Sequence, residues 1–65
     1  MIIAVNGKEQ DYPQGASLAD VIRILKLEGR LAVEVNLAII PRSAYASYIL
    51  QAGDRVEIVH AIGGG

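Results

Sequence analysis

One short segment of this chain has a helical pattern, and the segments around it run apolar or alternate as strands do. Its apolar side chains follow the i, i+3, i+4, i+7 spacing that lines one face of an amphipathic helix of about two to three turns: Leu18, Val21, Ile22 and Leu25. Ser17 is suited to the N-cap, Asp20 can complete a short capping box, and Gly29 is the predicted stop signal. A single helix among strands predicts an α+β fold.

The N-terminal residues predict a hairpin. Residues 1–5 form a short run rich in β-branched side chains, and residues 8–12 would form the return strand. Asn6-Gly7 between them suits a two-residue turn because both residue types tolerate positive φ.

The second half of the chain predicts further strands. Residues 31–35 alternate apolar with small or polar side chains, which indicates a half-buried strand. Residues 37–40 run into Pro41, which cannot donate a ladder hydrogen bond, so a turn and a short edge strand are expected. Residues 55–61 follow a Gly-Asp turn and predict the final strand.

Residues 42–50 leave two interpretations open. Tyr45, Ile49 and Leu50 would lie over the core if the segment formed a short helical turn, but the window is too short to separate a turn from a loop.

The element order resembles a ubiquitin-like β-grasp fold. Because the first and last strands are both apolar, each is expected near the centre of the sheet, paired in parallel. The prediction is a mixed sheet of about four to five strands with one helix packed across it and a flexible C-terminal glycine tail. Residues 1–61 would form the domain and residues 62–65 the tail. Val56 and Ile58 of the last strand would point inward.

Composition excludes several classes of protein. A 65-residue chain makes one small domain with little scaffold for a substrate pocket, so an autonomous enzyme is not expected. The 52% hydrophobic content argues against disorder, and a net charge of -1 with scattered basic residues argues against a nucleic-acid partner. The chain has no cysteine and one histidine, so no metal site is expected. Neither a signal peptide nor a membrane span is apparent, and a cytoplasmic location is expected.

The terminal glycines are the main candidate site. Gly63, Gly64 and Gly65 place the last carboxylate on a tether without side chains, which can enter a passage too narrow for other residues. The alternative is a frayed end. A carboxylate is a poor electrophile, so its use would require activation by a partner, and the chain would be a co-substrate.

The residues that flank the tail give weaker candidates. His60 could orient the terminal carboxylate, although a lone histidine at a strand end is more often structural. Asp54, Arg55 and Glu57 could contact a partner or be ordinary solvated surface.

Four further residues are candidates for a partner interface. Arg42, after Pro41, could pair with an acidic groove. Val59 and Ala61 would lie on the sheet face that the helix leaves uncovered, and Ile62 leads into the tail.

Several motifs together resemble one family. Asn6-Gly7, Val35-Asn36, the segment from Ile39 to Arg42 and the run from Gly53 to Gly65 are similar to the thiamine-biosynthesis sulfur carrier family, ThiS. The resemblance covers nearly the whole chain. Many members have a glycine after the position of Asn36, where this chain has Leu37.

The resemblance implies a role for the tail. An adenylating enzyme of the ThiF kind would use ATP to activate the carboxylate of Gly65, and a partner's cysteine persulfide would convert it into a thiocarboxylate. Thiazole synthase would then receive the sulfur. Gly64 would be the second residue of the family's terminal pair and Gly63 a spacer, and the chain itself would bind no cofactor.

The sequence is also compatible with other functions. The small subunit of molybdopterin synthase is a similar carrier, but it is usually longer and richer in phenylalanine, which this chain lacks. A non-covalent β-grasp adaptor with an idle tail is the alternative from another class, and a ubiquitin-type protein modifier is a further one.

Overall fold

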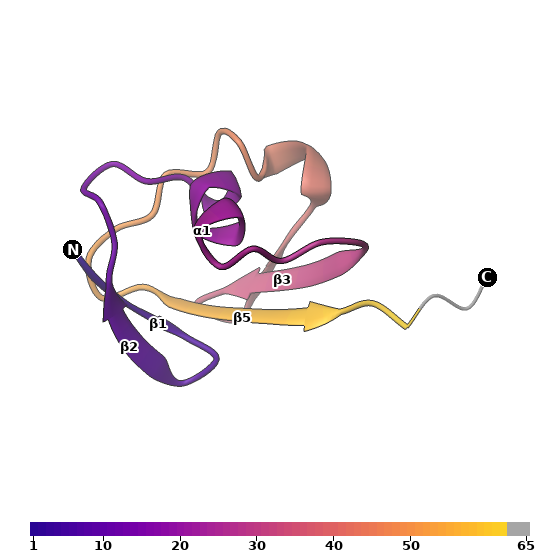
Figure 1. The fold of residues 1–65 in the computed structure, drawn as a ribbon, viewed down its shortest axis with the longest axis horizontal. Coiled ribbons are helices and arrows are strands. Elements are labelled where there is room, and N and C mark those ends of the chain that lie inside the picture. The colour runs from indigo at the N-terminus through magenta and orange to yellow at the C-terminus, as the bar shows by residue number, and fades with distance from the viewer. Residues whose placement is uncertain (63–65) are drawn as a thin grey trace.

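A mixed sheet with a helix across one face makes up the part of the chain that the computed structural model describes, residues 1–62 (Figure 1). The elements in chain order are β1 (Ile2–Val5), β2 (Lys8–Asp11), α1 (Leu18–Ile24), β3 (Leu31–Val35), β4 (Ala38–Ile40), the 3-10 helix η1 (Arg42–Ala44) and β5 (Arg55–His60). The sheet has five strands in the order β2-β1-β5-β3-β4. The predicted α+β, β-grasp architecture is confirmed.

The last strand lies in the middle of this sheet. It pairs in parallel with β1, where Val5 is opposite Val56, and antiparallel with β3, where Leu31 is opposite His60. Val56 and Ile58 are buried, as predicted. The parallel pairing of the first and last strands is therefore confirmed, and β4 is an edge strand.

Two hairpin turns have positive φ at both central residues. Asn6 and Gly7 have φ of 51° and 81°, as the Asn-Gly dipeptide predicts. Asn36 and Leu37 have φ of 50° and 73°, so the second turn has the same left-handed backbone conformation as the first, but without a glycine. A leucine in this region is strained because its Cβ crowds the backbone.

The helix begins as predicted but ends earlier. The Ser17 hydroxyl accepts from the Asp20 N–H at 3.1 Å, and the Asp20 carboxylate accepts from the Ser17 N–H at 2.9 Å, which completes a capping box. The prediction that Gly29 stops the helix is wrong. Lys26 takes φ of 57° and donates to the Arg23 carbonyl at 3.0 Å.

The bond that follows completes a C-terminal capping motif without glycine. The Leu27 N–H donates to the Ile22 carbonyl at 3.2 Å. Of the two hydrogen bonds of a Schellman motif, this is the one that spans more residues. Because Lys26 occupies the left-handed position that glycine usually fills, the helix end leaves no glycine signal in the sequence.

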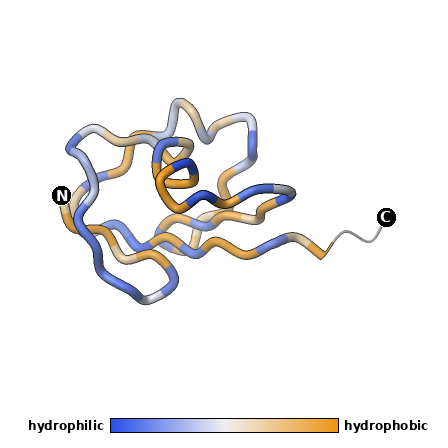
Figure 2. Tube along the Cα trace, viewed as in Figure 1, coloured by the Kyte–Doolittle hydropathy of each residue, from blue (hydrophilic) through white to orange (hydrophobic). Residues whose placement is uncertain are grey.

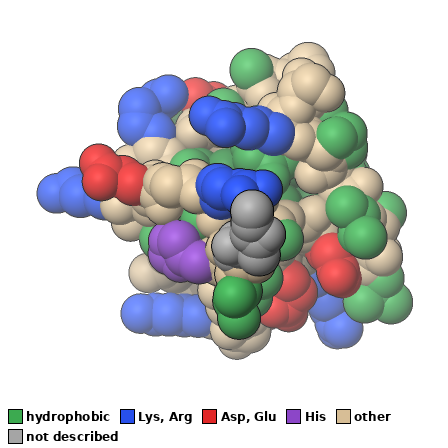
Figure 3. Space-filling model, turned by 90° about the vertical axis from the view of Figure 1, so that its right-hand side faces the viewer, with side chains coloured by type: hydrophobic (Ala, Val, Ile, Leu, Met, Phe, Trp, Pro, Cys, Tyr) green, Lys and Arg blue, Asp and Glu red, His purple; other side chains and the backbone are tan. Residues whose placement is uncertain are grey.

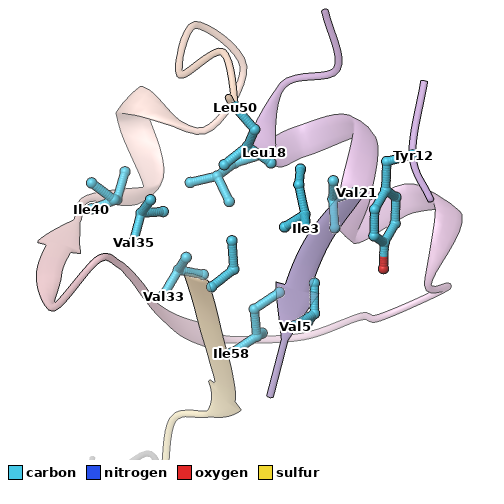
Figure 4. Close-up of a cluster of buried hydrophobic side chains, with 11 residues drawn as sticks. Ile3, Val5, Tyr12, Leu18, Val21, Val33, Val35, Ile40, Leu50 and Ile58 are labelled. Carbon is cyan, nitrogen blue, oxygen red and sulfur yellow. The ribbon is translucent and has the colours of Figure 1, made fainter. Parts of the chain in front are cut away.

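The core lies between α1 and the inner face of the sheet. Figure 2 shows hydrophobic residues along the helix face and strands that meet there, and Figure 4 shows their side chains converging. The core cluster consists of Ile3, Val5, Tyr12, Leu18, Val21, Val33, Val35, Ile40, Leu50, Val56 and Ile58.

The ambiguous segment after β4 is a 3-10 turn followed by an extended stretch. Leu50 is buried and Tyr45 half-buried, but Ile49 is exposed. Ile49 forms a bridge with Ser17, so the side chains of Ile49 and Leu50 point to opposite sides and, of these two, it is Leu50 that reaches the core. The interpretation that placed Ile49 over the core is wrong.

The length of α1 bears on membrane insertion. Among residues 1–62, no helix is long and apolar enough to cross a bilayer.

Candidate functional site

The site is the root of the glycine tail, where β5 leaves the sheet. β5 pairs with β3 over five residues, from Val56 opposite Val35 to His60 opposite Leu31. The strand is thus held along its length by hydrogen bonds and by buried side chains on its inner face. The tail therefore starts from a fixed element rather than from a loop.

Two hydrogen bonds hold the residues at the root to the loop between α1 and β3. The Ala61 N–H donates to the Arg30 carbonyl at 2.9 Å. The His60 ring nitrogen Nε2 lies 3.0 Å from the Glu28 carbonyl oxygen, so a proton on Nε2 completes a hydrogen bond. Ile62, the next residue, is 99% exposed. Figure 3 views this end and shows the histidine at the surface beside it.

Two asparagine side chains hold β5 from either side. Asn6 exchanges a pair of hydrogen bonds with the backbone of Ile58, at 2.8 and 3.0 Å. Asn36 accepts from the Arg55 N–H at 3.0 Å and donates to the Asp54 carboxylate at 3.0 Å. Both asparagines sit in the positive-φ turns and bond across to β5. The sequence indicated turns at these positions but not these side-chain contacts.

The comparisons with known proteins agree on one family. The ThiS family model matches residues 2–65. The chain belongs to the ThiS family. The crystal structure of thiamine biosynthesis protein ThiS from Geobacter metallireducens superposes with a TM-score of 0.87 at 28% identity, covering 100% of both chains. The expected ThiS resemblance and β-grasp fold are confirmed.

Two relatives of this ThiS chain are much longer proteins. A thiazole synthase of Paramagnetospirillum magneticum is 38% identical and one of Magnetococcus marinus 36% identical, each over 66 aligned positions. The alignment covers 100% of this chain but 20% of each relative, so the chain spans about a fifth of the length of these curated relatives.

The predicted interface residues lie on more than one surface. Val59 and Ala61 are exposed, Val59 on the sheet face opposite the helix, as expected. Arg42 is exposed at the start of η1 and lines a separate hollow of about 350 Å³ together with Leu31 and Tyr45. The structure thus places Val59 on β5 and Ile62 just beyond the end of this strand, but puts Arg42 elsewhere.

Asp54 has a structural role in the turn before β5. Its carboxylate accepts from the Gln51 N–H at 2.8 Å and from the Asn36 side chain. His60 contacts a backbone carbonyl, and no group of three or more possible metal-ligating side chains is present in residues 1–62.

The perturbed titrating groups lie away from the tail root. The Ser17 backbone N–H and then the Arg23 guanidinium hold the pKa of Asp20 below its usual 3.8. The amino group of Met1 does the same for the pKa of Asp11, and burial raises the pKa of Tyr12. These shifts belong to the helix N-terminus and the first strand pair.

The principal predicted site residues fall outside the described part of the chain. Gly63, Gly64 and Gly65 lie beyond residue 62, and so does most of the tail expected over residues 62–65. Ala61, the last residue of the domain predicted over residues 1–61, donates its N–H to the Arg30 carbonyl.

Proposed function

We propose that this chain is the sulfur carrier of thiamine biosynthesis and that the carboxylate of Gly65 carries the sulfur. The observation that supports the proposal is a tail root held in mid-sheet and tied by Ala61 to the Arg30 carbonyl. Four residues follow that anchor, and a fully extended tetrapeptide spans at most about 13–14 Å. A partner's active site would have to accept the tail within that reach.

The proposed chemistry needs two partners before the sulfur is delivered. An adenylating enzyme of the ThiF kind joins the carboxylate to AMP from ATP and releases pyrophosphate. A cysteine persulfide attacks the acyl carbon and displaces AMP, and a second thiol then cleaves the sulfur–sulfur bond. The thiocarboxylate leaves with the sulfur, and the two cysteines end as a disulfide. Catalysis comes from the partners, and this chain supplies an unhindered glycine carbonyl.

Thiazole synthase is the proposed acceptor. The two curated relatives named thiazole synthase each contain a segment similar to this whole chain within a longer polypeptide. A carrier and an acceptor that share one polypeptide have an effective concentration set by their linker, which favours their working together. In the present proposal, this carrier and thiazole synthase meet in the cytoplasm. The family assignment also favours thiamine over molybdopterin use.

The test is incubation with ATP, a ThiF-type enzyme and a persulfide donor, followed by intact-mass measurement. We expect one oxygen to be replaced by sulfur, and a variant lacking Gly65 should stay unchanged. Absence of the shift with a competent activating enzyme would contradict the carrier function. A non-covalent adaptor would instead keep its full activity without Gly65.

The acceptor is tested separately. The thiocarboxylated chain is mixed with thiazole synthase in one reaction and with the large subunit of molybdopterin synthase in another. Sulfur transfer to the thiazole product alone is the expected result, and transfer to the molybdopterin enzyme alone would favour the alternative carrier.

A further inference from the structure

The connector between α1 and β3, residues 25–30, holds the root of the tail through two of its carbonyl groups. Figure 1 shows this connector running to the end of the molecule from which the tail leaves. The Glu28 carbonyl oxygen lies 3.0 Å from the His60 ring nitrogen Nε2, and the Arg30 carbonyl accepts from the Ala61 N–H at 2.9 Å. The direction in which the tail leaves β5 therefore depends on the position of the connector.

The middle of the connector is not fixed by packing. Glu28, Gly29 and Arg30 are exposed. Glu28 and Gly29 also line a hollow of about 350 Å³. A backbone segment with solvent on one side and a hollow on the other has few packing contacts, so its position depends on the hydrogen bonds at its two ends.

The first end of the connector is fixed by the capping bonds of α1. The Lys26 N–H donates to the Arg23 carbonyl at 3.0 Å, and the Leu27 N–H donates to the Ile22 carbonyl at 3.2 Å. The Leu27 side chain also packs against the core. The helix itself therefore holds this end.

The second end of the connector meets β3 at a residue whose carbonyl has lost its ladder partner. Arg30 bonds to β5, so the carbonyl of the next residue, Leu31, points to the side of β4. The pairing of β3 with β4 ends where Val33 is opposite Ile40. The register would place Arg42 opposite Leu31, but the chain has by then turned into η1. The Leu31 carbonyl needs a donor from elsewhere.

The Tyr45 side chain supplies this donor. Its hydroxyl donates to the Leu31 carbonyl at 3.3 Å. The tyrosine is itself held in place, since its ring packs against the core and its backbone carbonyl accepts from the Ala19 N–H at 3.0 Å. A tyrosine side chain has two rotatable torsions, so a fixed backbone and a packed ring fix the hydroxyl as well.

We propose that Tyr45 is a positioning residue for the reactions of the tail, and that its hydroxyl acts through Leu31 and the connector. The inference rests on the proposed carrier function. Tyr45 touches neither a partner nor the reacting carboxylate. Its hydroxyl restricts the connector, and the connector restricts Ala61. A partner that accepts the tail from this ordered root has less chain entropy to remove on binding.

A positioning role makes the same demand on both partners. The tail has to enter the adenylating enzyme first and thiazole synthase afterwards, and it leaves from the same root each time. Loss of order at the root should therefore slow adenylation and sulfur transfer by similar factors. A side chain that contacts the surface of one partner would affect the reaction with that partner alone.

The test is Tyr45→Phe, which removes the hydroxyl and keeps the ring. Hydrogen exchange of the Ala61 amide should accelerate about threefold to tenfold, the equivalent of one hydrogen bond. At temperatures well below the Tm, kcat/KM should fall about threefold to fivefold in both reactions, mainly through KM because the lost order is restored on binding. Tyr45→p-aminophenylalanine places an N–H donor at a similar reach and should restore all three values.

Two other tyrosines provide matched controls. Within residues 1–62, the tyrosine hydroxyls that donate hydrogen bonds belong to Tyr12 and Tyr45. Tyr12→Phe removes a 3.1 Å bond to the Gln10 side chain, beside the end of β2, and Tyr48→Phe removes a hydroxyl without such a bond in this part of the chain. Neither control should change the exchange of Ala61 relative to that of other amides, and neither should change kcat/KM.

Three outcomes would overturn the proposal. If Tyr45→Phe behaves as the two controls do while the tail is still converted, the positioning role fails and the carrier function stands. If kcat/KM falls for one partner alone, or without faster exchange at Ala61, the Tyr45 hydroxyl contacts a partner directly. If a competent activating enzyme converts neither the unaltered chain nor any variant, the carrier function fails, and with it the role proposed for Tyr45.

Discussion

Asn6 and Ile58 are joined by a pair of hydrogen bonds between a side chain and a backbone far apart in the sequence. The Asn6 Oδ1 accepts from the Ile58 N–H at 2.8 Å, and the Asn6 Nδ2 donates to the Ile58 carbonyl at 3.0 Å. The parallel ladder of β1 and β5 pairs Ala4 with Arg55 and Val5 with Val56. The Asn6 side-chain amide thus extends the pairing of β5 past the point where β1 ends.

Replacing Asn6 tests this extension. Asn6→Gly keeps the positive φ and removes both hydrogen bonds, so the free energy of unfolding should fall by about 1–3 kcal/mol. Asn6→Ala also places a Cβ in the left-handed region and should cost about 1 kcal/mol more. Urea unfolding measures both values.

The control for Asn6 is Asn36→Gly, which removes the hydrogen bond to Arg55 at the start of the strand. Hydrogen exchange of the Ile58 amide should accelerate in the Asn6 variants. In Asn36→Gly, this exchange should accelerate no more than the loss of global stability requires. Equal acceleration in both would mean that Asn6 stabilises the fold only globally.

Leu37 is the second position at which a single change should have a clear effect. It has φ of 73° and is 88% exposed, so it bears backbone strain without compensating burial. Leu37→Gly should raise the free energy of unfolding by about 0.5–1 kcal/mol, after the greater unfolded-state entropy of glycine is subtracted. Leu37→Ala keeps the strain and should give no gain. If Leu37→Ala raises the Tm in a thermal melt as much as Leu37→Gly does, the stabilisation comes from loss of the exposed leucine side chain and not from relief of backbone strain.

Local patterns predicted the elements well because each pattern has a direct physical cause. Alternation predicted the buried faces of β3 and β5, and the Asn6-Gly7 dipeptide predicted its turn. Positive φ at Leu37 could be inferred only from the family, since leucine itself disfavours it. The end of the helix at Ile24 was missed for the same reason, because Lys26 fills the left-handed position where glycine usually stands.

The contacts of the candidate site were harder to predict. The bonds from Asn6 to Ile58 and from His60 to the Glu28 carbonyl join residues distant in sequence, so no periodicity contains them. That Glu34 of β3 lies opposite Glu57 of β5 depends on strand register, which individual strand patterns leave open. The role proposed for the tail rests on glycine chemistry and family resemblance.

Acidification should weaken the helix N-terminus through Asp20. The Ser17 backbone N–H, and then the Arg23 guanidinium, lower the pKa of this carboxyl in the folded chain relative to its usual 3.8. A lowered folded pKa stabilises the fold above the unfolded value, and the contribution is lost as pH falls below 3.8 through the folded pKa. The Tm difference between the unaltered chain and Asp20→Asn should therefore be largest above about pH 5 and shrink in acid.

Arg23→Gln serves as the comparison for that titration. It leaves the larger contribution, the Ser17 N–H, in place, so most of the pH-dependent Tm difference should persist. If Arg23→Gln removes the dependence of Tm on pH as fully as Asp20→Asn does, the ion pair with Arg23, and not the capping box, is the main cause of the lowered Asp20 pKa.

His60 should act as a positioning residue for the reaction at Gly65. Its ring ties the end of β5 to the Glu28 carbonyl, and Ala61 next to it bonds Arg30. A partner that receives the tail from an ordered root has less chain entropy to remove on binding. His60→Ala should therefore lower kcat/KM for adenylation about threefold to tenfold, the equivalent of one hydrogen bond, and accelerate hydrogen exchange at Ala61.

The conservative variant separates positioning from simple destabilisation. In His60→Gln the side-chain amide nitrogen has a reach similar to Nε2 and can donate to the same carbonyl, so it should recover most of kcat/KM and slow the Ala61 exchange again. A purely structural role would lower Tm in His60→Ala while adenylation of the folded fraction stayed unchanged. A direct chemical role for the imidazole would leave His60→Gln as impaired as His60→Ala, although its Ala61 amide was protected.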